Sequence, residues 1–321
     1  MTSESIARTS VVIAAYDTDR FGDLADAVRA LGQQSVPPRE VIVAVDRNPE
    51  LVALASRQLP TVTVVPNREH HGAGGARNSG AAVASGELIA FMDDDAVPSP
   101  DWIERIEDCL GEDGVIGVGG FIEPWWLGRQ PQWFPAEFGW VVGCSYTGLP
   151  NGRARVRNVI AANMAIRRQV FESIGGFRRD FGKQGGHSEP EETDLCIRAA
   201  RRWPERTWIY DPAIHVRHRV PSSRARFGYF VRRCFNEGTG KASLASLVGP
   251  GDALSEETAY VRKVLPRGIA QGLAAFFGGR DAFGLLRAAA IVVGLSVTAA
   301  AYLATSALAR MPTRSRRRTA A

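Results

Sequence analysis

The first 92 residues contain four short segments that are apolar along almost their whole length. These segments are residues 10–15, 41–45, 61–65 and 88–92. Apolar residues at helical spacing in residues 21–34, and a helix-like pattern in residues 50–59, separate the first three segments. Strands that are apolar on both faces are typical of a parallel sheet covered by helices on both sides. The chain is therefore predicted to adopt an α/β fold with a Rossmann-like, mostly parallel sheet.

Turn and cap signals place the later boundaries of this fold. A glycine-rich turn at residues 72–75 is expected to precede a helix of small residues. Ser99 followed by Pro100 predicts a helix start with Ser99 as the N-cap. Residues 163–175 regain helical character after a short strand, and an acidic cluster near residue 190 opens a further helix.

The net charge of +5 is concentrated at the C-terminal end of the chain. Residues 310–318 contain five arginines, so the remainder is close to neutral. Apolar residues make up 45% of the chain and charged residues 23%, the proportions of an ordinary globular protein. Because no broad basic surface is expected, nucleic acid is excluded as a partner.

The last 60 residues differ in composition from the rest. Residues 288–309 are 22 consecutive uncharged residues, many of them alanine. As a helix they would extend about 33 Å, enough for a hydrocarbon core of ~30 Å, although the alanines make insertion energetically marginal. Residues 268–279 are too short to span but suit the membrane interface, and the basic tail suits anionic headgroups. We predict a globular domain at residues 1–260 and a membrane-associating segment at residues 261–321.

Alternatives for this C-terminal segment stay open. It could instead be a buried helix with a solvated basic tail. If the globular domain is cytoplasmic, a single span would place the arginines outside, against the usual lysine and arginine bias. A re-entrant or interfacial helix avoids that conflict, and we expect attachment to the cytoplasmic face of a membrane.

Three adjacent carboxylates, Asp93, Asp94 and Asp95, directly follow the fourth apolar segment. The carboxyl ends of strands in open α/β sheets are where ligands bind. Neighbouring carboxylates repel one another, so a divalent cation explains their grouping, and oxygen ligands suit Mg²⁺ or Mn²⁺ bridging to phosphate. Alternation along a strand places Asp93 and Asp95 on the same side, where both could contact the metal. The alternative is a solvated acidic turn.

The glycine segment at residues 72–80 has no standard nucleotide-binding motif. Arg77 stands where the third glycine of G-x-G-x-x-G would be, and no Gly-Lys-Ser/Thr of a P-loop follows. A helix N-terminus together with Arg77 could still approach a diphosphate. The alternative is that Arg77 is an ordinary surface cation.

A second acidic cluster lies in residues 189–194 and includes Glu191, Glu192 and Asp194. A carboxylate here could act as a general base towards a hydroxyl group. Acidic residues at a helix start are also what capping and the helix dipole favour, so the cluster alone decides nothing. Further along, one imidazole of His215 or His218 could complete a metal shell, although a lone histidine is more often structural.

Aromatic residues gather in the irregular region after residue 121. Trp140 and its neighbouring tryptophans suit either an acceptor-binding loop or aromatic packing in the core. Arg232 and Arg233 lie in a second aromatic-rich stretch, where guanidinium groups suit a phosphate of donor or acceptor. A solvated helix face is an equal alternative for at least one of these arginines.

Five motifs in this order resemble family 2 glycosyltransferases over about residues 9–240. They are the segment 11–16, the lone Asp46, Ala76-Arg77-Asn78, residues 91–95 and residues 191–195. Further motifs at residues 119–126, 133–138, 175–177 and 218–221 resemble glucosyl-dolichyl-phosphate glucuronosyltransferases. The resemblance implies a GT-A fold, a UDP-sugar donor, a divalent metal, inversion at the anomeric carbon and a polyprenyl-phosphate-linked acceptor.

The resemblance also implies roles for individual positions. Ala15, Tyr16 and Asp46 would contact the nucleoside, and Arg77 would face the uridine or the diphosphate. Asp93 and Asp95 would bind ribose, metal and diphosphate, with Asp94 turned away or reaching the sugar. His218 would be a third metal ligand. The usual catalytic aspartate is replaced by Glu192, with Glu191 beside it, so the choice between these two bases stays open.

From these patterns we predict an inverting, metal-dependent glycosyltransferase that moves a sugar from a nucleotide-sugar to a lipid-linked or polysaccharide acceptor. A nucleotidyltransferase on a related sheet is one alternative, but residues 14–20 lack the basic G-x-G-x-R loop that it would need. A second alternative is a membrane-tethered protein that binds nucleotide-sugars without catalysis.

Overall fold

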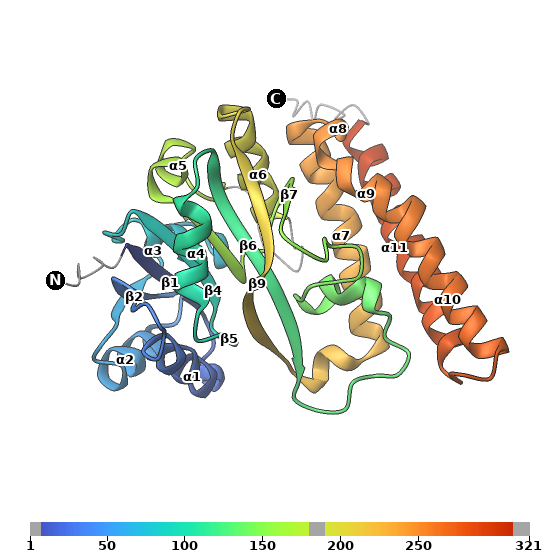
Figure 1. Cartoon of the computed structure of the whole chain (residues 1–321), viewed down its shortest axis with the longest axis horizontal. Helices are drawn as coiled ribbons and strands as arrows, with labels where there is room; N and C mark the ends of the chain where they lie inside the picture. The colour runs from blue at the N-terminus through green and yellow to red at the C-terminus, as the bar shows by residue number, and fades with distance from the viewer. Residues whose placement is uncertain (1–7, 180–189, 311–321) are drawn as a thin grey trace, which may run out of the picture.

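The computed structural model describes residues 8–179 and 190–310 (Figure 1). Their strands form one nine-stranded sheet, in the order β3-β2-β1-β4-β8-β6-β9-β5, with β7 paired to β9. Helices cover both faces of this sheet, and a layer of long helices follows at the C-terminal side (Figure 1). The predicted α/β fold is confirmed.

The N-terminal half of the sheet is parallel, as predicted. β1 (Thr9–Ala15) lies between β2 (Glu40–Val45) and β4 (Leu88–Asp93), and β3 (Thr63–Pro66) pairs with β2. The intervening helices are α1 (Phe21–Leu31), α2 (Pro49–Gln58) and α3 (Ala73–Ala81), with a 3-10 turn η1 (Thr18–Arg20) before α1. All three parallel pairs end at the edge where the acidic triplet begins.

The second half of the sheet runs in both directions. β8 (Asn163–Arg167) is antiparallel to β4 and to β6 (Val115–Trp126), and β6 is parallel to β9 (Thr207–Val220). β5 (Ala96–Pro98) and β7 (Ala154–Val156) are antiparallel to β9. The long strands β6 and β9 were not predicted, because their glycines, prolines and tryptophans hide the alternation. Residues 212–214 also bulge between two registers of the β6–β9 pair.

Two predicted helix starts were wrong. Ser99 is not an N-cap, since its backbone N–H still donates to His215 O in the strand pairing, and α4 (Trp102–Gly111) begins after Asp101. Residues 72–75 are not a turn, because α3 begins at Ala73. Its small residues allow close packing instead: a Cβ on Gly80 would lie 2.5 Å from Val12 Cγ1.

The later helix predictions are mixed. Residues 163–167 form β8, and the helix α5 covers only Arg168–Ser173. The helix expected near residue 190 is confirmed as α6 (Glu191–Arg202). Acidic residues fill its first turn and arginines its last, which complements the helix dipole.

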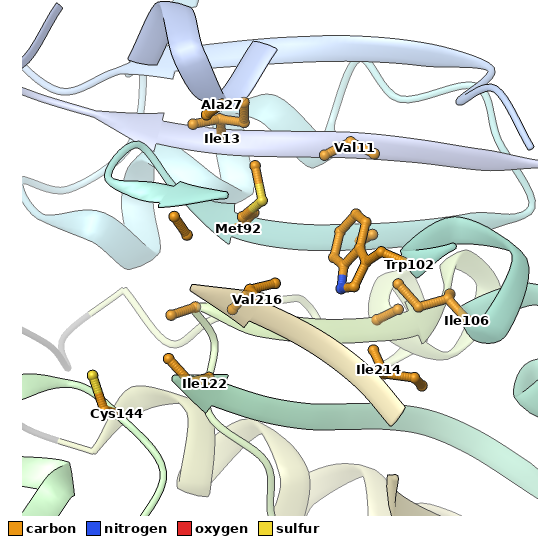
Figure 2. Close-up of a cluster of buried hydrophobic side chains, with 14 of the residues drawn as sticks. Val11, Ile13, Ala27, Met92, Trp102, Ile106, Ile122, Cys144, Ile214 and Val216 are labelled. Carbon is orange, nitrogen blue, oxygen red and sulfur yellow. The ribbon is translucent and has the colours of Figure 1, made fainter. Parts of the chain in front are cut away.

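The apolar core has two layers, one on each side of the sheet. Val11, Ile13 and Met92 point towards α1 and α4, where Trp102 and Ile106 pack beside Ile214 and Val216 of β9 (Figure 2). Alternate residues such as Val12 and Phe91 point to the other face, which is covered by α3, α5 and α6. This two-sided burial explains the nearly continuous apolar segments of the sequence.

The aromatic residues after residue 121 pack as core. Phe134 and Phe138 are buried against Phe230 of α7 (Phe227–Val248), with ring centroids 6.0 and 5.2 Å away. The 3-10 helix η2 (Ala136–Val142) carries Phe138 and Trp140. Of the two alternatives for this region, aromatic packing therefore describes the contacts of these rings.

The C-terminal helices form a layer of their own beyond the sheet. The short 3-10 helix η3 (Ser222–Ala225) precedes α7. After α7 come α8 (Pro250–Ala253), α9 (Ser255–Ala259), a π-helical turn η4 (Tyr260–Val264), α10 (Leu265–Phe277) and α11 (Gly284–Arg310). α10 and α11 lie side by side, with α7 between them and the sheet (Figure 1). Gly272 and Gly284 face each other so closely that a Cβ on either would clash with the other's carbonyl oxygen. Small residues at helix contacts are typical of membrane proteins.

α11 is the membrane candidate among the described residues. Gly284–Ala309 is long and apolar enough to cross a bilayer, by length and composition, and only 28% of its most apolar window is buried. A core helix of a soluble protein would be mostly covered. The domain boundary predicted at residue 260 falls where η4 begins and stays a prediction. The basic tail beyond Arg310 lies outside the described residues.

Candidate active site

Three metal-ligating side chains meet where β4 ends. Asp93, Asp95 and His218 place one ligand atom each within 4.8 Å of one another. His218 Nε2 lies 3.0 Å from Asp95 Oδ1 and 4.0 Å from Asp93 Oδ2. The antiparallel pairing of β5 with β9 brings them together, because Ala96, the residue after Asp95, pairs with His218.

This cluster fits a divalent cation. Two carboxylates and one imidazole are ligands that Mn²⁺ accepts, and the carboxylates also suit Mg²⁺. Asp95 Oδ1 is buried and forms an ion pair with His218 Nε2 without a well-aligned hydrogen bond, so a bound ion could still satisfy this oxygen. His215 is not part of the cluster, since it stacks on Phe121 and pairs with Glu123. Of the two predicted imidazoles, His218 is therefore the candidate ligand.

The charges of this cluster are coupled. Burial alone would lower the pKa of His218, but the neighbouring Asp95 carboxylate raises it to about 10. Burial would raise the pKa of Asp95, and His218 lowers it instead. The imidazolium thus neutralises Asp95 in the absence of a cation. Because a metal ligand must be unprotonated, metal binding here would release a proton.

Arg20 is a member of the site that the sequence analysis missed. Its guanidinium forms ion pairs with Asp94 and with Asp95, the latter at 2.5 Å, and lies over the Tyr16 ring. Asp94 is buried, and burial raises its pKa to about 8 although Arg20 opposes this and Asp95 adds to it. Asp94 is not one of the three residues of the ligand cluster, and whether it turns away or reaches the sugar stays a prediction. The sequence did contain a signal for Arg20. It follows the first strand, so it lies at the sheet edge where the acidic triplet also begins.

Arg77 is buried rather than a surface cation. It is 5% exposed, donates to Asp93 Oδ1 at 2.7 Å and to Glu191 Oε1 at 2.8 Å, and lies over the Phe177 ring. Burial would lower its pKa, but Asp93 and Glu191 outweigh that effect. Arg77 therefore links the metal cluster to the second acidic cluster. The two residues that it joins, Asp93 and Glu191, are 98 positions apart in the sequence.

The acidic residues of α6 divide into three environments. Burial raises the pKa of Glu191 to about 7, against the attraction of Arg77, and Glu192 adds to the rise. Glu192 is half-buried and forms no ion pair among the described residues, and burial raises its pKa as well. Asp194 is fully buried, with one oxygen 3.1 Å from Arg178 and the other 2.7 Å from Arg198. These contacts hold Asp194 between two arginines, and its catalytic role stays a prediction.

The residues predicted to contact the nucleoside lie at the ends of β1 and β2. Asp46 is buried and accepts hydrogen bonds from Asn67 at 2.7 Å and from the Gly72 N–H at 3.0 Å. Gly72 has φ of +121°, a conformation that favours glycine and aims this N–H at the carboxylate. Ala15 is buried, whereas Tyr16 is 51% exposed. Only Tyr16 offers a side-chain surface on which a base could stack.

The predicted acceptor residues lie on η2 and α7. Trp140 is half-buried, packs on Phe138 and donates to the Tyr260 hydroxyl at 3.3 Å. Arg232 is exposed over the Tyr229 ring, and Arg233 is half-buried, with its Nε lacking a hydrogen-bond partner among the described residues. Their role in binding an acceptor stays a prediction.

Residues 10–175 match the family model described as Glycosyl transferase family 2. The chain is 32% identical over 263 residues to the glucosyl-dolichyl phosphate glucuronosyltransferase of Haloferax volcanii, covering 80% of this chain and 83% of that protein. It is 27% identical over 235 residues to the succinoglycan biosynthesis protein ExoM of Rhizobium meliloti, covering 69% and 71%. Among solved structures it is similar to the mannosyltransferase PcManGT of Pyrobaculum calidifontis in complex with GDP-Man and Mn²⁺, with a TM-score of 0.57 and 20% identity over 95% of this chain and 87% of that one. At that identity the likeness concerns the fold alone.

Proposed function

The chain belongs to glycosyl transferase family 2, and on that premise we propose that it is an inverting, metal-dependent enzyme that transfers a sugar from a UDP-sugar to a lipid-linked or polysaccharide acceptor. Its fold is of the GT-A type, and the predicted enzyme class, a glycosyltransferase, is confirmed. The name of the Haloferax volcanii relative supports UDP-glucuronate as the first donor to test. Neither a nucleotidyltransferase nor a non-catalytic binding protein finds support in these likenesses.

The observation that carries this proposal is the convergence of Asp93, Asp95 and His218 beside a buried arginine. A divalent cation held by these three residues would supply charge stabilisation for the departing nucleoside diphosphate. Arg77, at the N-terminal half of α3, would add a guanidinium towards the same phosphates once it exchanges its bond to Asp93. Tyr16 and Asp46 would hold the nucleoside at the neighbouring strand ends.

Glu192 is our proposed general base. Inversion requires a carboxylate on the face of the sugar opposite the leaving group, and Glu192 would accept the proton of the attacking acceptor hydroxyl. The oxygen then bonds to the anomeric carbon as the bond to the diphosphate breaks. Glu191 is held by Arg77 through a direct ion pair, so we assign it to positioning that arginine.

We further propose that the enzyme works at a membrane surface. The solvent-facing side of α11 carries an apolar stripe without charges: Leu285, Ala289, Val292, Ser296, Ala299, Leu303 and Ala307. Arg262, Lys263 and Arg267 are exposed at the start of the hairpin that α11 forms with α10. An apolar face with adjacent cations suits an anionic bilayer surface, and a lipid-linked acceptor would be presented there. The cytoplasmic face is the expected side.

Metal-coupled nucleotide binding tests the active site. UDP at saturating concentration should raise the melting temperature in the presence of Mn²⁺ and have little effect with chelator, because ligand binding stabilises by mass action. Replacement His218→Ala removes one proposed ligand and should weaken Mn²⁺ binding by about 10- to 100-fold, as measured by titration calorimetry.

The matched control is His215→Ala, three residues earlier on the same strand and outside the cluster. It should retain the coupled binding of Mn²⁺ and UDP. Equal losses in both variants would mean that the effect comes from disturbing β9 rather than from removing a ligand. Absence of coupling in the unaltered protein would remove the metal-dependent mechanism altogether.

Flotation with vesicles tests the membrane proposal. Three glutamates introduced on the exposed stripe of α11, at Leu285, Val292 and Leu303, should reduce binding to vesicles of phosphatidylglycerol by at least about 100-fold, since each charge is costly to bury in lipid. Val83→Glu is the control, because Val83 is 48% exposed but belongs to the segment between α3 and β4. Unchanged flotation of the triple variant would rule out α11 as the contact.

A further inference from the structure

A cavity of about 640 Å³ lies between the C-terminal hairpin and the segment that follows β6. Its walls come from residues 130–137, from α10 and from the start of α11. None of the residues of the metal cluster lines it. Ligand sites commonly have volumes of roughly 300–1,000 Å³ and few well-placed polar groups, so this cavity has the size of a binding site.

The chemistry of the walls is that of carbohydrate recognition. Three amides face the cavity from both sides: Gln130, Gln132 and Gln271. Two aromatic rings, Phe134 and Phe283, provide apolar surface on which the carbon face of a sugar ring could rest. Amides can both donate to and accept from hydroxyl groups, and carboxylates accept from them.

The charges of the walls argue against a phosphate as the ligand. Glu137 and Asp281 contribute two carboxylates, and Arg287 contributes one guanidinium. Arg287 is already ion-paired with Asp281 and donates to the Gln132 carbonyl at 3.1 Å. Glu137 is 9% exposed, and its position is held by the Tyr260 hydroxyl, which donates to its carbonyl at 2.6 Å. A neutral ligand rich in hydroxyl groups is therefore favoured over an anion.

The position of the cavity relates it to the metal cluster. Ala136 and Glu137, at the start of η2, line the cavity. Gly143, directly after η2, lies beside the ring of His218, since a Cβ placed on it would be 3.3 Å from His218 Cε1. A 3-10 helix rises about 2 Å per residue, so the seven residues of η2, which is kinked at Phe138, separate the two places by no more than roughly 14 Å. A short oligosaccharide can bridge such a distance.

We propose that this cavity binds sugar residues of the acceptor glycan, while the hydroxyl that receives the new sugar lies at Glu192. The inference rests on the proposed transferase function, and it gives the enzyme an acceptor-binding site away from the metal cluster. It predicts that glycan binding depends on Gln271 and on free volume next to Ala275. It also gives the hairpin a role besides membrane contact, because α10 and α11 form one wall of the cavity.

Filling the cavity gives a sharp test. Ala275→Trp places an indole in a lining position, whereas Ala274→Trp, the next residue of α10, adds the same side chain at an exposed position that does not line the cavity. The probes are maltose, cellobiose and diacetylchitobiose, titrated by saturation-transfer NMR. At least one disaccharide should bind the unaltered protein, and Ala275→Trp and Gln271→Ala should weaken that binding by about tenfold or more. Ala274→Trp should not.

Stabilisation by UDP with Mn²⁺, measured on the same samples, reports whether the fold and the donor site are intact. If that stabilisation persists and no disaccharide binds, or if both tryptophan variants behave alike, the cavity assignment is wrong and the transferase proposal stands. Displacement of the disaccharide by farnesyl phosphate at lower concentration would also overturn it, in favour of a lipid site. Loss of UDP stabilisation in the unaltered protein would instead refute the proposed function itself.

Discussion

Replacing Asp95 by asparagine should reduce kcat/KM for sugar transfer by about a thousandfold. The substitution keeps the size of the side chain and removes the charge with which the cluster can hold a dication. The electrostatic contribution at stake is several kcal/mol, and each ~1.4 kcal/mol corresponds to a factor of ten in rate. Asp95 is 3% exposed and contacts both His218 and Arg20. Because the side chain is buried, water cannot compensate for the loss of its negative charge. The measurement is the initial rate of UDP release with Mn²⁺ and acceptor.

Asp94→Asn is the matched control for this prediction. The two residues are adjacent, equally buried and paired with the same arginine. Burial raises the pKa of Asp94 to about 8, so its charged form is disfavoured and loss of the charge should cost less at Asp94 than at Asp95. We expect a loss of no more than about tenfold. A larger loss for Asp94→Asn than for Asp95→Asn would reverse the roles that we assign within the triplet.

The second large effect concerns the general base. Glu192→Gln should lower kcat by about 100- to 10,000-fold, the range that general base catalysis commonly contributes, and leave the KM for the UDP-sugar nearly unchanged. Glu191→Gln should behave differently. It removes one of the two counter-charges of buried Arg77, so we expect mainly a raised KM for the donor. Steady-state kinetics with each substrate varied separates the two outcomes.

The pH profile provides an independent check on the base. Burial raises the pKa of Glu192 above the usual value of a glutamate, so the carboxylate becomes protonated at a higher pH than an exposed one. Protonation removes the acceptor for the hydroxyl proton, and kcat should therefore fall as the pH decreases. Glu192→Gln should lack this acidic limb. If the limb persists in Glu192→Gln and disappears in Glu191→Gln, whose pKa burial raises to about 7, then Glu191 is the base.

Sequence patterns were most informative where the structure depends on local alternation. The four apolar segments predicted β1 to β4. β1, β2 and β4 are buried on both faces, whereas the edge strand β3 is only partly buried, and Asp93 to Asp95 followed directly from the end of β4. Predictions failed where tertiary pairing overrode a local signal. Ser99 and Pro100 read as a helix start, but pairing with His215 keeps that backbone extended. In β6 and β9, glycine, proline and a bulge conceal two long strands whose neighbours, not their own pattern, stabilise them.

The candidate site shows the same division. The acidic triplet, Arg77 and the acidic start of α6 could be named from sequence, because each stands beside a recognisable strand or helix end. Their grouping could not be worked out from local pattern, since Arg77 joins Asp93 to Glu191 across two acidic clusters far apart in the chain. Arg20 was missed, because a side chain's partners depend on which face of its element is covered.

The sequence by itself determined the parallel half of the sheet, the edge at which it carries carboxylates, and an apolar C-terminal helix. The burial pattern of a strand or a helix repeats over a few consecutive residues, so it can be recognised from the sequence. The tertiary structure decided that Arg20 and Arg77 balance the charges of the carboxylates and that the hairpin closes a cavity, and it brings His218 to Asp93 and Asp95, a meeting that the sequence implied only through its family resemblance. The physical reason is that strand pairing and helix packing bring together side chains from distant segments, and no local pattern encodes those distances.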